Sequence, residues 1–339
     1  MTRRSFAALA APLLAAPDGR IRAAIIGTGH GHAHSKVVAL QSMPEYAFAG
    51  VWQPDPDEPA VGPAFQKVRR LSEAEVLQDA SIELAVLEFA DPERNLEFAQ
   101  RCAEAGKWVH LDKPPGASLS GLRRLLEEAG RRVRGVQMGY QWRYHPGMQA
   151  AMEAAQRGWL GRVYRFRASI DKPIGAEERR HLAKYRGGMM FSEGCHLIDR
   201  ATALLGKPTR VHGFLRHDSP EADGLADNNL VVLEYPGALA EISLAGFDPH
   251  GNSHRFLEIL GTNGSARVQP FAPFRVTVTL KEAAGLYRAG EQALALEGQT
   301  YTPDFAELAS TIRRGTPPRY TAAHDLMTHA VLLEACGML

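Results

Sequence analysis

The chain has 339 residues, of which 45% are hydrophobic and 23% charged, and its 39 Lys and Arg residues nearly balance 38 Asp and Glu residues. This is the composition of an ordinary globular protein, and a net charge of +1 gives no footprint for nucleic acid or for an acidic partner. No stretch approaches the roughly 18 apolar residues that a membrane span needs. Three widely spaced cysteines exclude a disulfide framework and a zinc ribbon.

The N-terminal segment, residues 1–17, differs from the rest of the chain. Arg3 and Arg4 precede Ser5 and Phe6, and a run rich in Ala and Leu follows up to Pro17. This order is typical of a twin-arginine export signal, which would place the protein in the periplasm. The alternative is the frayed N-terminus of a cytoplasmic protein, and we favour export.

Residues 18–140 alternate between short buried strands and amphipathic helices. The length of the chain favours two domains, since single cores stop growing at about 250–300 residues, and this alternation marks the first. It predicts a doubly wound parallel sheet, an α/β domain of the Rossmann type. The strands are expected at 21–27, 46–52, 82–89, 108–111 and 135–140, with helices at 33–43, 72–79, 92–106 and 119–129.

Residues 141–339 follow a different pattern, in which apolar and polar residues alternate along successive strands. It predicts a second α/β domain with an open, mostly antiparallel sheet and helices on one side, suited to substrate binding and oligomerisation. The last helix is expected to pack back on the first domain. Strands are expected at 163–170, 209–217, 228–236, 238–247, 254–261, 265–270 and 274–280, with helices at 147–158, 192–205, 303–315 and 322–339.

A glycine turn joins the first strand to the first helix in IIGTGHGHAHS. Gly27 permits a tight turn, and Gly29 lets the backbone of Thr28 and its neighbours approach a pyrophosphate at the helix N-terminus. The third position of the dinucleotide fingerprint is His32, which departs from the usual glycine. The turn therefore predicts a dinucleotide site with an altered contact between the first helix and the sheet.

Three histidines, His30, His32 and His34, follow this turn and raise a metal site as an alternative. A metal site needs ligands that face one point, and no cysteine or carboxylate cluster lies nearby in the sequence. We therefore predict no metal, and we expect His30 and His32 to line the cofactor site.

The choice between NAD and NADP depends on the end of the second strand, where NAD enzymes place an acidic residue for the ribose. This chain has Gln53 there, with Asp55 two places later. Gln53 can bond a ribose without excluding a 2′-phosphate. No arginine follows directly, which slightly favours NAD.

Three longer stretches resemble the glucose–fructose oxidoreductase/inositol dehydrogenase (Gfo/Idh/MocA) family. They are AEAGKWVHLDKPPGASL at 103–119, the stretch at 139–168, and GGMMFSEGCHLIDRATALLGKPTRV at 187–211. The resemblance implies an NAD(P)-dependent oxidoreductase that transfers hydride from a hydroxyl of a sugar, cyclitol or related polyol. It also implies a homodimer or homotetramer that forms through the open sheet.

The same resemblance assigns site residues. Lys113 carries over as a catalytic residue beside the cofactor, with Asp112 in place of the usual Glu, and His196 carries over as the general acid/base. Ser192 stands where many members have Asp, and a regular helix would not let the adjacent Glu193 replace it. The residues expected to contact substrate are Arg143, Tyr185, Ser192, Glu193 and Asp199.

Two other functions stay open at this point. A glycoside hydrolase of the same fold would use tightly held NAD for transient oxidation. The substitution at Ser192 also leaves room for a non-catalytic protein that senses the cofactor.

Overall fold

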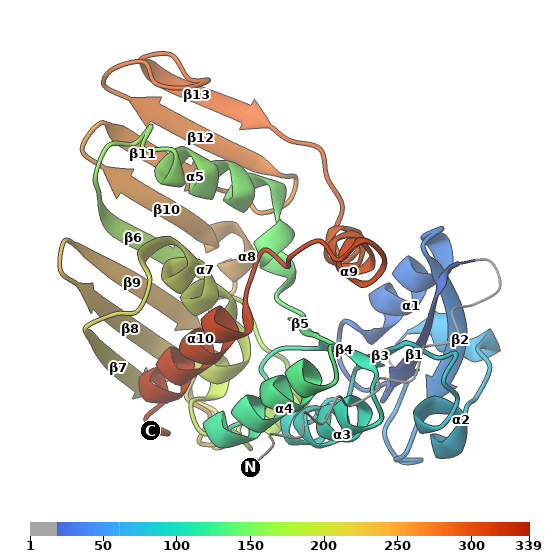
Figure 1. Ribbon diagram of the computed structural model, residues 1–339. Helices are drawn as coiled ribbons and strands as arrows, with labels where there is room; N and C mark the ends of the chain where they lie inside the picture. Colours follow the sequence, from blue (N-terminus) through green and yellow to red (C-terminus); the bar gives the residue numbers. More distant parts are fainter. Residues whose placement is uncertain (1–18, 61) are drawn as a thin grey trace, which may run out of the picture. The chain divides into compact units, whose positions relative to one another are not determined.

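The computed structural model describes residues 19–60 and 62–339, so the predicted export segment, residues 1–17, lies outside the described residues. None of the helices within these ranges has the length and apolar character to cross a membrane. The chain divides into two compact units. The first runs to Gly139 and includes Phe305–Pro317, and the second contains Tyr140–Asp304 and Pro318–Leu339 (Figure 1).

The first unit is built on a five-stranded parallel sheet with the order β2-β1-β3-β4-β5. Helices connect these parallel strands along the chain, and the apolar side chains Ile21, Ile25 and Ile26 of β1 are fully buried. This confirms the doubly wound sheet. The strands are β1 (Ile21–Ile26), β2 (Tyr46–Trp52), β3 (Leu84–Leu87), β4 (Trp108–Leu111) and β5 (Val136–Met138), and the helices are α1 (Ala33–Ser42), α2 (Glu73–Leu77), α3 (Pro92–Glu104) and α4 (Leu119–Arg131).

The strand order reverses at β1, which pairs with β2 on one side and with β3 on the other. Open α/β sheets bind ligands at such a switch point, outside the carboxyl ends of the strands. Here the glycine turn follows β1, Glu88 to Ala90 follow β3, and Asp112 and Lys113 follow β4. The fold therefore brings these three loops to one edge of the sheet.

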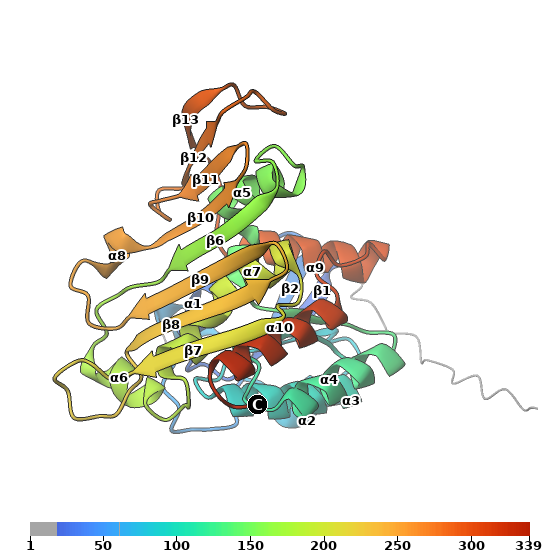
Figure 2. The ribbon, with the colours of Figure 1, turned by 90° about the vertical axis from the view of Figure 1, so that its left-hand side faces the viewer.

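The second unit is built on an eight-stranded sheet with the order β13-β12-β11-β10-β6-β9-β8-β7. Only β6 and β9 pair in parallel, which confirms the mostly antiparallel sheet. Helices α5, α7 and α10 cover one face (Figure 2). The strands are β6 (Val163–Ser169), β7 (Arg210–Arg216), β8 (Asn228–Tyr235), β9 (Ala238–Ala245), β10 (Phe256–Gly261), β11 (Gly264–Val268), β12 (Arg275–Leu280) and β13 (Gly290–Ala295), and the helices are α5 (Pro146–Gln156), α6 (Ala176–Leu182), α7 (Cys195–Leu205), α8 (Gly251–His254) and α10 (Ala322–Ala335).

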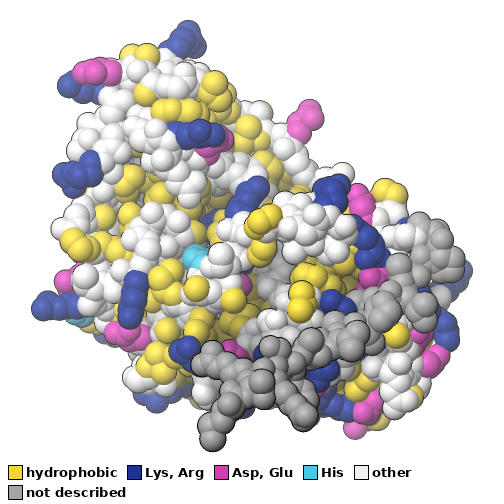
Figure 3. Space-filling view, viewed as in Figure 1, with side chains coloured by type: hydrophobic (Ala, Val, Ile, Leu, Met, Phe, Trp, Pro, Cys, Tyr) yellow, Lys and Arg dark blue, Asp and Glu magenta, His cyan; other side chains and the backbone are white. Residues whose placement is uncertain are grey.

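Charged side chains are dispersed over the surface. The face drawn in Figure 3 shows Lys and Arg side chains interspersed with Asp and Glu, and no continuous basic band crosses the described residues on that face. This distribution agrees with the near-zero net charge of the sequence.

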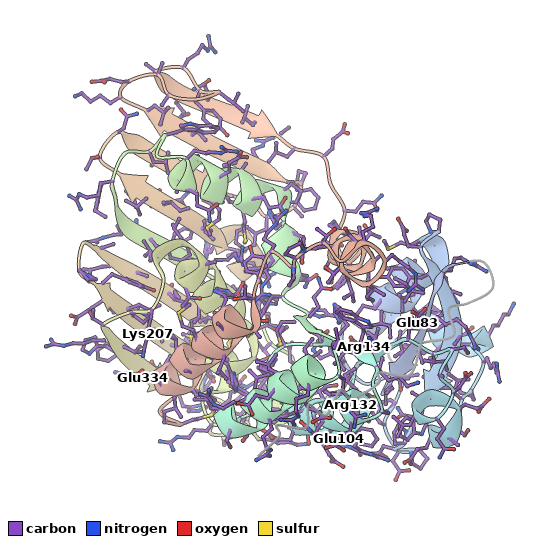
Figure 4. The ribbon with its side chains drawn as sticks, in the orientation of Figure 1. Glu83, Glu104, Arg132, Arg134, Lys207 and Glu334 are labelled. Carbon is purple, nitrogen blue, oxygen red and sulfur yellow. The ribbon has the colours of Figure 1, made fainter. Side chains whose placement is uncertain are left out.

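Helix α9 (Thr302–Arg314) supplies the part of the first unit that comes from late in the sequence. The carbonyl of Phe305 accepts a hydrogen bond from the Tyr46 hydroxyl at 2.6 Å, and its ring stacks on His110 with centroids 4.8 Å apart. Arg313 forms a two-pronged ion pair with Glu83, which is labelled in Figure 4 and is 2% exposed. The segment that joins the first unit is thus α9, whereas the last helix, α10, belongs to the second unit.

Candidate functional site

The glycine turn after β1 has the backbone that its sequence requires. Gly27 has φ +80°, and a Cβ there would lie 2.7 Å from the backbone nitrogen of Phe89, so only glycine fits. A Cβ on Gly29 would lie 2.6 Å from the carboxyl carbon of Glu58. Gly27 therefore makes the tight turn, and Gly29 lets an acidic group lie against the backbone.

Glu58 is an acidic residue of this site that the sequence analysis missed. One carboxylate oxygen accepts hydrogen bonds from the backbone N–H of Thr28 at 3.0 Å and from Nε2 of Gln53 at 2.9 Å. The other accepts from the backbone N–H of Ala90 at 2.9 Å. The rule for a ribose-binding acid examines the strand end, where Gln53 stands, and so passes over a residue five places later.

A buried ionic cluster lies beside the turn and centres on Asp112. Its Oδ2 is 3.1 Å from His30 Nδ1, 3.0 Å from His32 Nδ1 and 2.6 Å from Lys36 Nζ. Lys36 is only 1% exposed and also pairs with Glu88. Lys36 and Glu88 were not among the predicted residues. The signal for Lys36 was a lysine on the apolar face of α1, between Ala33 and Leu40.

The pKa values in this cluster follow from its charges. Burial by itself would raise the pKa of Asp112, but the positive charges of His30 and Lys36 hold it well below its usual range. Burial opposes the charged form of His30 too, and the neighbouring Asp112 and Glu88 still raise its pKa to about 9. Burial lowers the pKa of His32. At neutral pH, His30 and Lys36 therefore carry the positive charge that Asp112 balances.

The metal alternative needs a correction in one respect. The fold does bring a carboxylate to the histidines, and the ligand atoms of His30, His32 and Asp112 lie within 4.8 Å of one another. The sequence argument missed this because Asp112 lies 80 residues beyond His32. However, the ammonium of Lys36 binds the same carboxylate oxygen and His30 holds a proton, so the charges favour a hydrogen-bonded network over a metal site.

Lys113 follows Asp112 at the end of β4 and is 5% exposed. Its backbone N–H donates to Oδ1 of Asp112 at 2.6 Å. Asp112 therefore uses one oxygen for the Lys113 segment and the other for the residues after β1. Lys113 belongs to the first unit and His196 to the second.

In the second unit, His196 lies on α7 among aromatic rings and is 2% exposed. Its imidazole stacks on Trp142 with centroids 4.8 Å apart and meets Tyr140 edge-on at 5.9 Å. The Tyr140 hydroxyl is buried and has no hydrogen-bond partner among the described residues. Burial raises the pKa of Tyr140 well above its usual range, so this hydroxyl stays protonated.

The chain does not enter α7 as a regular helix. A π-helical turn, Met190–Gly194, precedes it and contains Ser192 and Glu193. Such a turn differs from the regular helix expected from the sequence and is frequent at functional sites, while the adjacent side chains of Ser192 and Glu193 still point in different directions. Glu193 Oε1 accepts from Nζ of Lys172 at 3.0 Å, and Lys172 was not among the predicted residues.

Arg143 and Asp199, both expected to contact substrate, instead bind each other. Arg143 Nη2 lies 2.7 Å from Asp199 Oδ1 and 2.5 Å from Asp325 Oδ1, and Asp199 also pairs with Arg200 and His324. Arg143 is 2% exposed and Asp199 fully buried. The structure therefore places them in a buried network that joins the start of the second unit to α7 and α10.

Tyr185 packs beside the π-helical turn, with its ring centroid 6.0 Å from that of Phe191. It lines an open groove of about 530 Å³ between β7 and the end of α10, with Arg186, Cys336 and Glu334, the last of which is labelled in Figure 4. Among the described residues, neither His196 nor Glu193 lines this groove. The structure thus groups Ser192, Glu193 and His196 on one segment, and Tyr185 lies against the start of that segment while also lining the groove.

Comparisons with known proteins find relatives that align with most of the chain. Residues 148–267 match the model of the GFO/IDH/MocA C-terminal domain. The chain is 24% identical over 317 residues to scyllo-inositol 2-dehydrogenase (NAD(+)) of Bacillus subtilis, which covers 90% of each protein. It is 24% identical over 253 residues to myo-inositol 2-dehydrogenase of Thermotoga maritima, covering 72% of this chain and 73% of the relative.

Solved structures share the fold. An oxidoreductase from Agrobacterium radiobacter in complex with NAD+, L-tartaric acid and magnesium superposes with a TM-score of 0.79 at 17% identity, covering 94% of this chain and 96% of the other. An oxidoreductase from Erwinia carotovora atroseptica superposes with a TM-score of 0.78 at 22% identity, covering 94% and 98%. The resemblance drawn from the motifs is confirmed: residues 148–267 match the C-terminal domain of the Gfo/Idh/MocA family, and inositol dehydrogenases are among the relatives that align with most of the chain.

Proposed function

We propose that this protein is an NAD(P)-dependent oxidoreductase that acts on a hydroxyl group of a sugar, cyclitol or related polyol. The observation that carries the proposal is the glycine turn at the switch point of the sheet. There the N–H groups of Thr28 and Ala90 converge on an acidic group at the Gly29 backbone. Two relatives are named as inositol dehydrogenases, which supports the polyol class of substrate.

The residues around the turn fit a dinucleotide. The backbone donors and the side-chain-free Gly29 backbone, against which the Glu58 carboxylate lies here, suit its phosphates, and the positively charged His30 lies beside the turn. The ribose hydroxyl is assigned to Gln53 at the end of β2, whose amide donates to Thr28 in this structure. We favour NAD over NADP, because no arginine follows Gln53 and the Bacillus subtilis relative is named for NAD(+).

In the proposed reaction, the cofactor's nicotinamide supplies hydride transfer, and the side chains of this protein handle the proton and the substrate. The ammonium of Lys113 polarises the substrate oxygen. His196 takes the hydroxyl proton, and the rings of Trp142 and Tyr140 hold its imidazole in place. Ser192 is a poor base, so its proposed role is a hydrogen bond to the substrate, with Glu193 and Lys172 beside it.

The test begins with the mass of any small molecule that co-purifies with the protein, which separates NAD from NADP. Cofactor reduction is then followed spectroscopically with a panel of inositols, aldoses and sugar alcohols. We expect at least one cyclic polyol to reduce the cofactor. Bound cofactor with no polyol oxidised would contradict the proposal, and release of the leaving group from an aryl glycoside without net NADH would select the glycoside hydrolase.

Two further expectations belong to the same proposal. Export by the segment 1–17 would place the enzyme in the periplasm with its cofactor already bound, since the twin-arginine route carries folded proteins. The open face of the eight-stranded sheet is proposed as the surface through which copies associate. Phe214 and Leu230, paired on β7 and β8, are 57% and 36% exposed there.

A further inference from the structure

The segment that follows β2, Gln53 to Glu58, folds back onto the glycine turn. It is fixed at three points. Gln53 Nε2 donates to Oγ1 of Thr28 at 2.6 Å, Asp55 forms an ion pair with Arg94 of α3 at 2.8 Å, and Glu58 binds the turn itself. Because proline fixes φ, the two prolines at 54 and 56 stiffen the segment between these contacts.

The carboxylate of Glu58 uses the donors that an anionic ligand of the turn would need. Its two oxygens accept the N–H groups of Thr28 and Ala90, which come from the loops after β1 and β3. It also lies flat against Gly29, at the point where the missing side chain exposes the backbone. A glycine turn of this kind serves phosphate because its N–H groups are open, and here an internal anion occupies them.

A dinucleotide phosphate and this carboxylate compete for the same place. Each N–H group donates one good hydrogen bond, and two negative groups held against one turn repel each other. Ligand binding must therefore release Glu58 from the turn.

We propose that Gln53–Glu58 is a displaceable cap, in which the carboxylate of Glu58 occupies the anion-binding donors of the glycine turn until a dinucleotide replaces it. The inference rests on the proposed function of the turn. The cap sets the affinity of the site, because the apparent dissociation constant equals the intrinsic constant divided by the fraction of molecules in which the cap is open. A cap closed in nine-tenths of the molecules weakens binding about tenfold.

Calorimetric titration of the full chain with NAD and NADP tests the cap. Glu58→Gln removes the negative charge and keeps the size of the side chain. Asp57→Asn makes the same charge change at the neighbouring exposed residue and serves as the matched control. We expect Glu58→Gln to bind NAD about tenfold more tightly than wild type, with Asp57→Asn unchanged. Hydrogen exchange of residues 53–60 should rise when NAD is added to wild type.

Two other outcomes would overturn the inference, and they can be told apart. If wild type binds NAD and Glu58→Gln binds it equally or more weakly, the cap is wrong while the dinucleotide site stands, and Glu58 is a contact to the ligand. If wild type, Glu58→Gln and Glu58→Ala all fail to bind NAD, NADP and inorganic pyrophosphate, both the cap and the proposed function fail.

Discussion

At the residue scale, Asp112 shows how one buried carboxylate joins two loops. Its Oδ1 accepts from the Lys113 backbone, and its Oδ2 faces His30, His32 and Lys36. The departure at His32, where a third glycine is usual, has a partner here, since its Nδ1 lies 3.0 Å from this carboxylate. A hydrogen bond to a buried carboxylate thus stands where glycine usually provides close helix–sheet packing.

Asp112→Asn should therefore destabilise the first unit. The substitution leaves the buried Lys36 and the part-buried His30 beside a neutral amide, with Glu88 as their remaining carboxylate, and breaking a buried ion pair costs about 3–5 kcal/mol. The free energy of unfolding in urea at pH 7 measures this loss. Glu127→Gln, on the exposed face of α4, is the control and should change it by less than about 0.5 kcal/mol. A loss no larger than the control's would show that the network contributes nothing.

Lys113 and His196 are predicted to act on the reacting groups. Lys113→Met keeps the length of the side chain and removes the ammonium, so kcat should fall by about 10²- to 10⁴-fold with little change in thermal stability. His196→Asn should lower kcat similarly and remove one limb of its pH profile. Lys207→Met, at the exposed residue labelled in Figure 4, is the control. An unchanged kcat in Lys113→Met would exclude its catalytic role.

At the element scale, α10 carries a buried histidine that makes the free energy of unfolding depend on pH. His329 lies on this helix, is fully buried, and has no hydrogen-bond partner for either ring nitrogen among the described residues. Burial lowers its pKa to about 4. The unfolded chain binds a proton at this histidine below about pH 6.5, whereas the folded protein does not until about pH 4. Stability is therefore lost as the pH falls through this window.

His329→Leu should remove this loss. We expect the free energy of unfolding of wild type to fall more steeply between pH 7 and pH 5 than that of the variant. His30 does not affect the comparison. Its raised pKa adds stability that is fully present below about pH 6.5 and is lost as the pH rises through about 9. Parallel curves for the two proteins over this range would show that His329 is not the cause.

At the scale of the whole molecule, the open sheet face carries a row of alternating charges. Glu241, Arg167, Glu258 and Arg267 lie opposite one another on β9, β6, β10 and β11, with N–O distances of 3.9, 3.2 and 3.2 Å. Arg167 and Glu241 remain 40% and 42% exposed. A partly exposed row of this kind, next to exposed apolar residues, suits a polar contact between copies of the chain.

Arg167→Glu should disrupt the proposed assembly. It reverses the charge in the middle of the row and places three acidic side chains together, so the dimer or tetramer should dissociate at least tenfold more readily. Light scattering after size-exclusion chromatography measures the mass. Arg123→Glu, on the exposed face of α4 in the first unit, is the control. A monomeric wild type, or an assembly indifferent to Arg167→Glu, would exclude this face.

The sequence by itself determined the class of each sheet and the order of the predicted elements, whereas β13, α6 and α8 were not predicted. Period-two and helical patterns depend on which residues are apolar, and Gly27 marks its turn because only glycine adopts φ +80° against Phe89. The family motifs likewise keep their order along the chain. All of these signals are local, so they are readable without the fold.

Only the tertiary structure decided which polar groups meet. Glu58 reaches Thr28 and Ala90 from the segment after β2, Asp112 reaches His32 across 80 residues, and Arg143 reaches Asp325 across 182. The π-helical turn before α7 also has no local signature in the sequence. Buried charges take the partners that the packing brings to them, and the sequence separation of those partners carries no information about their distance in space.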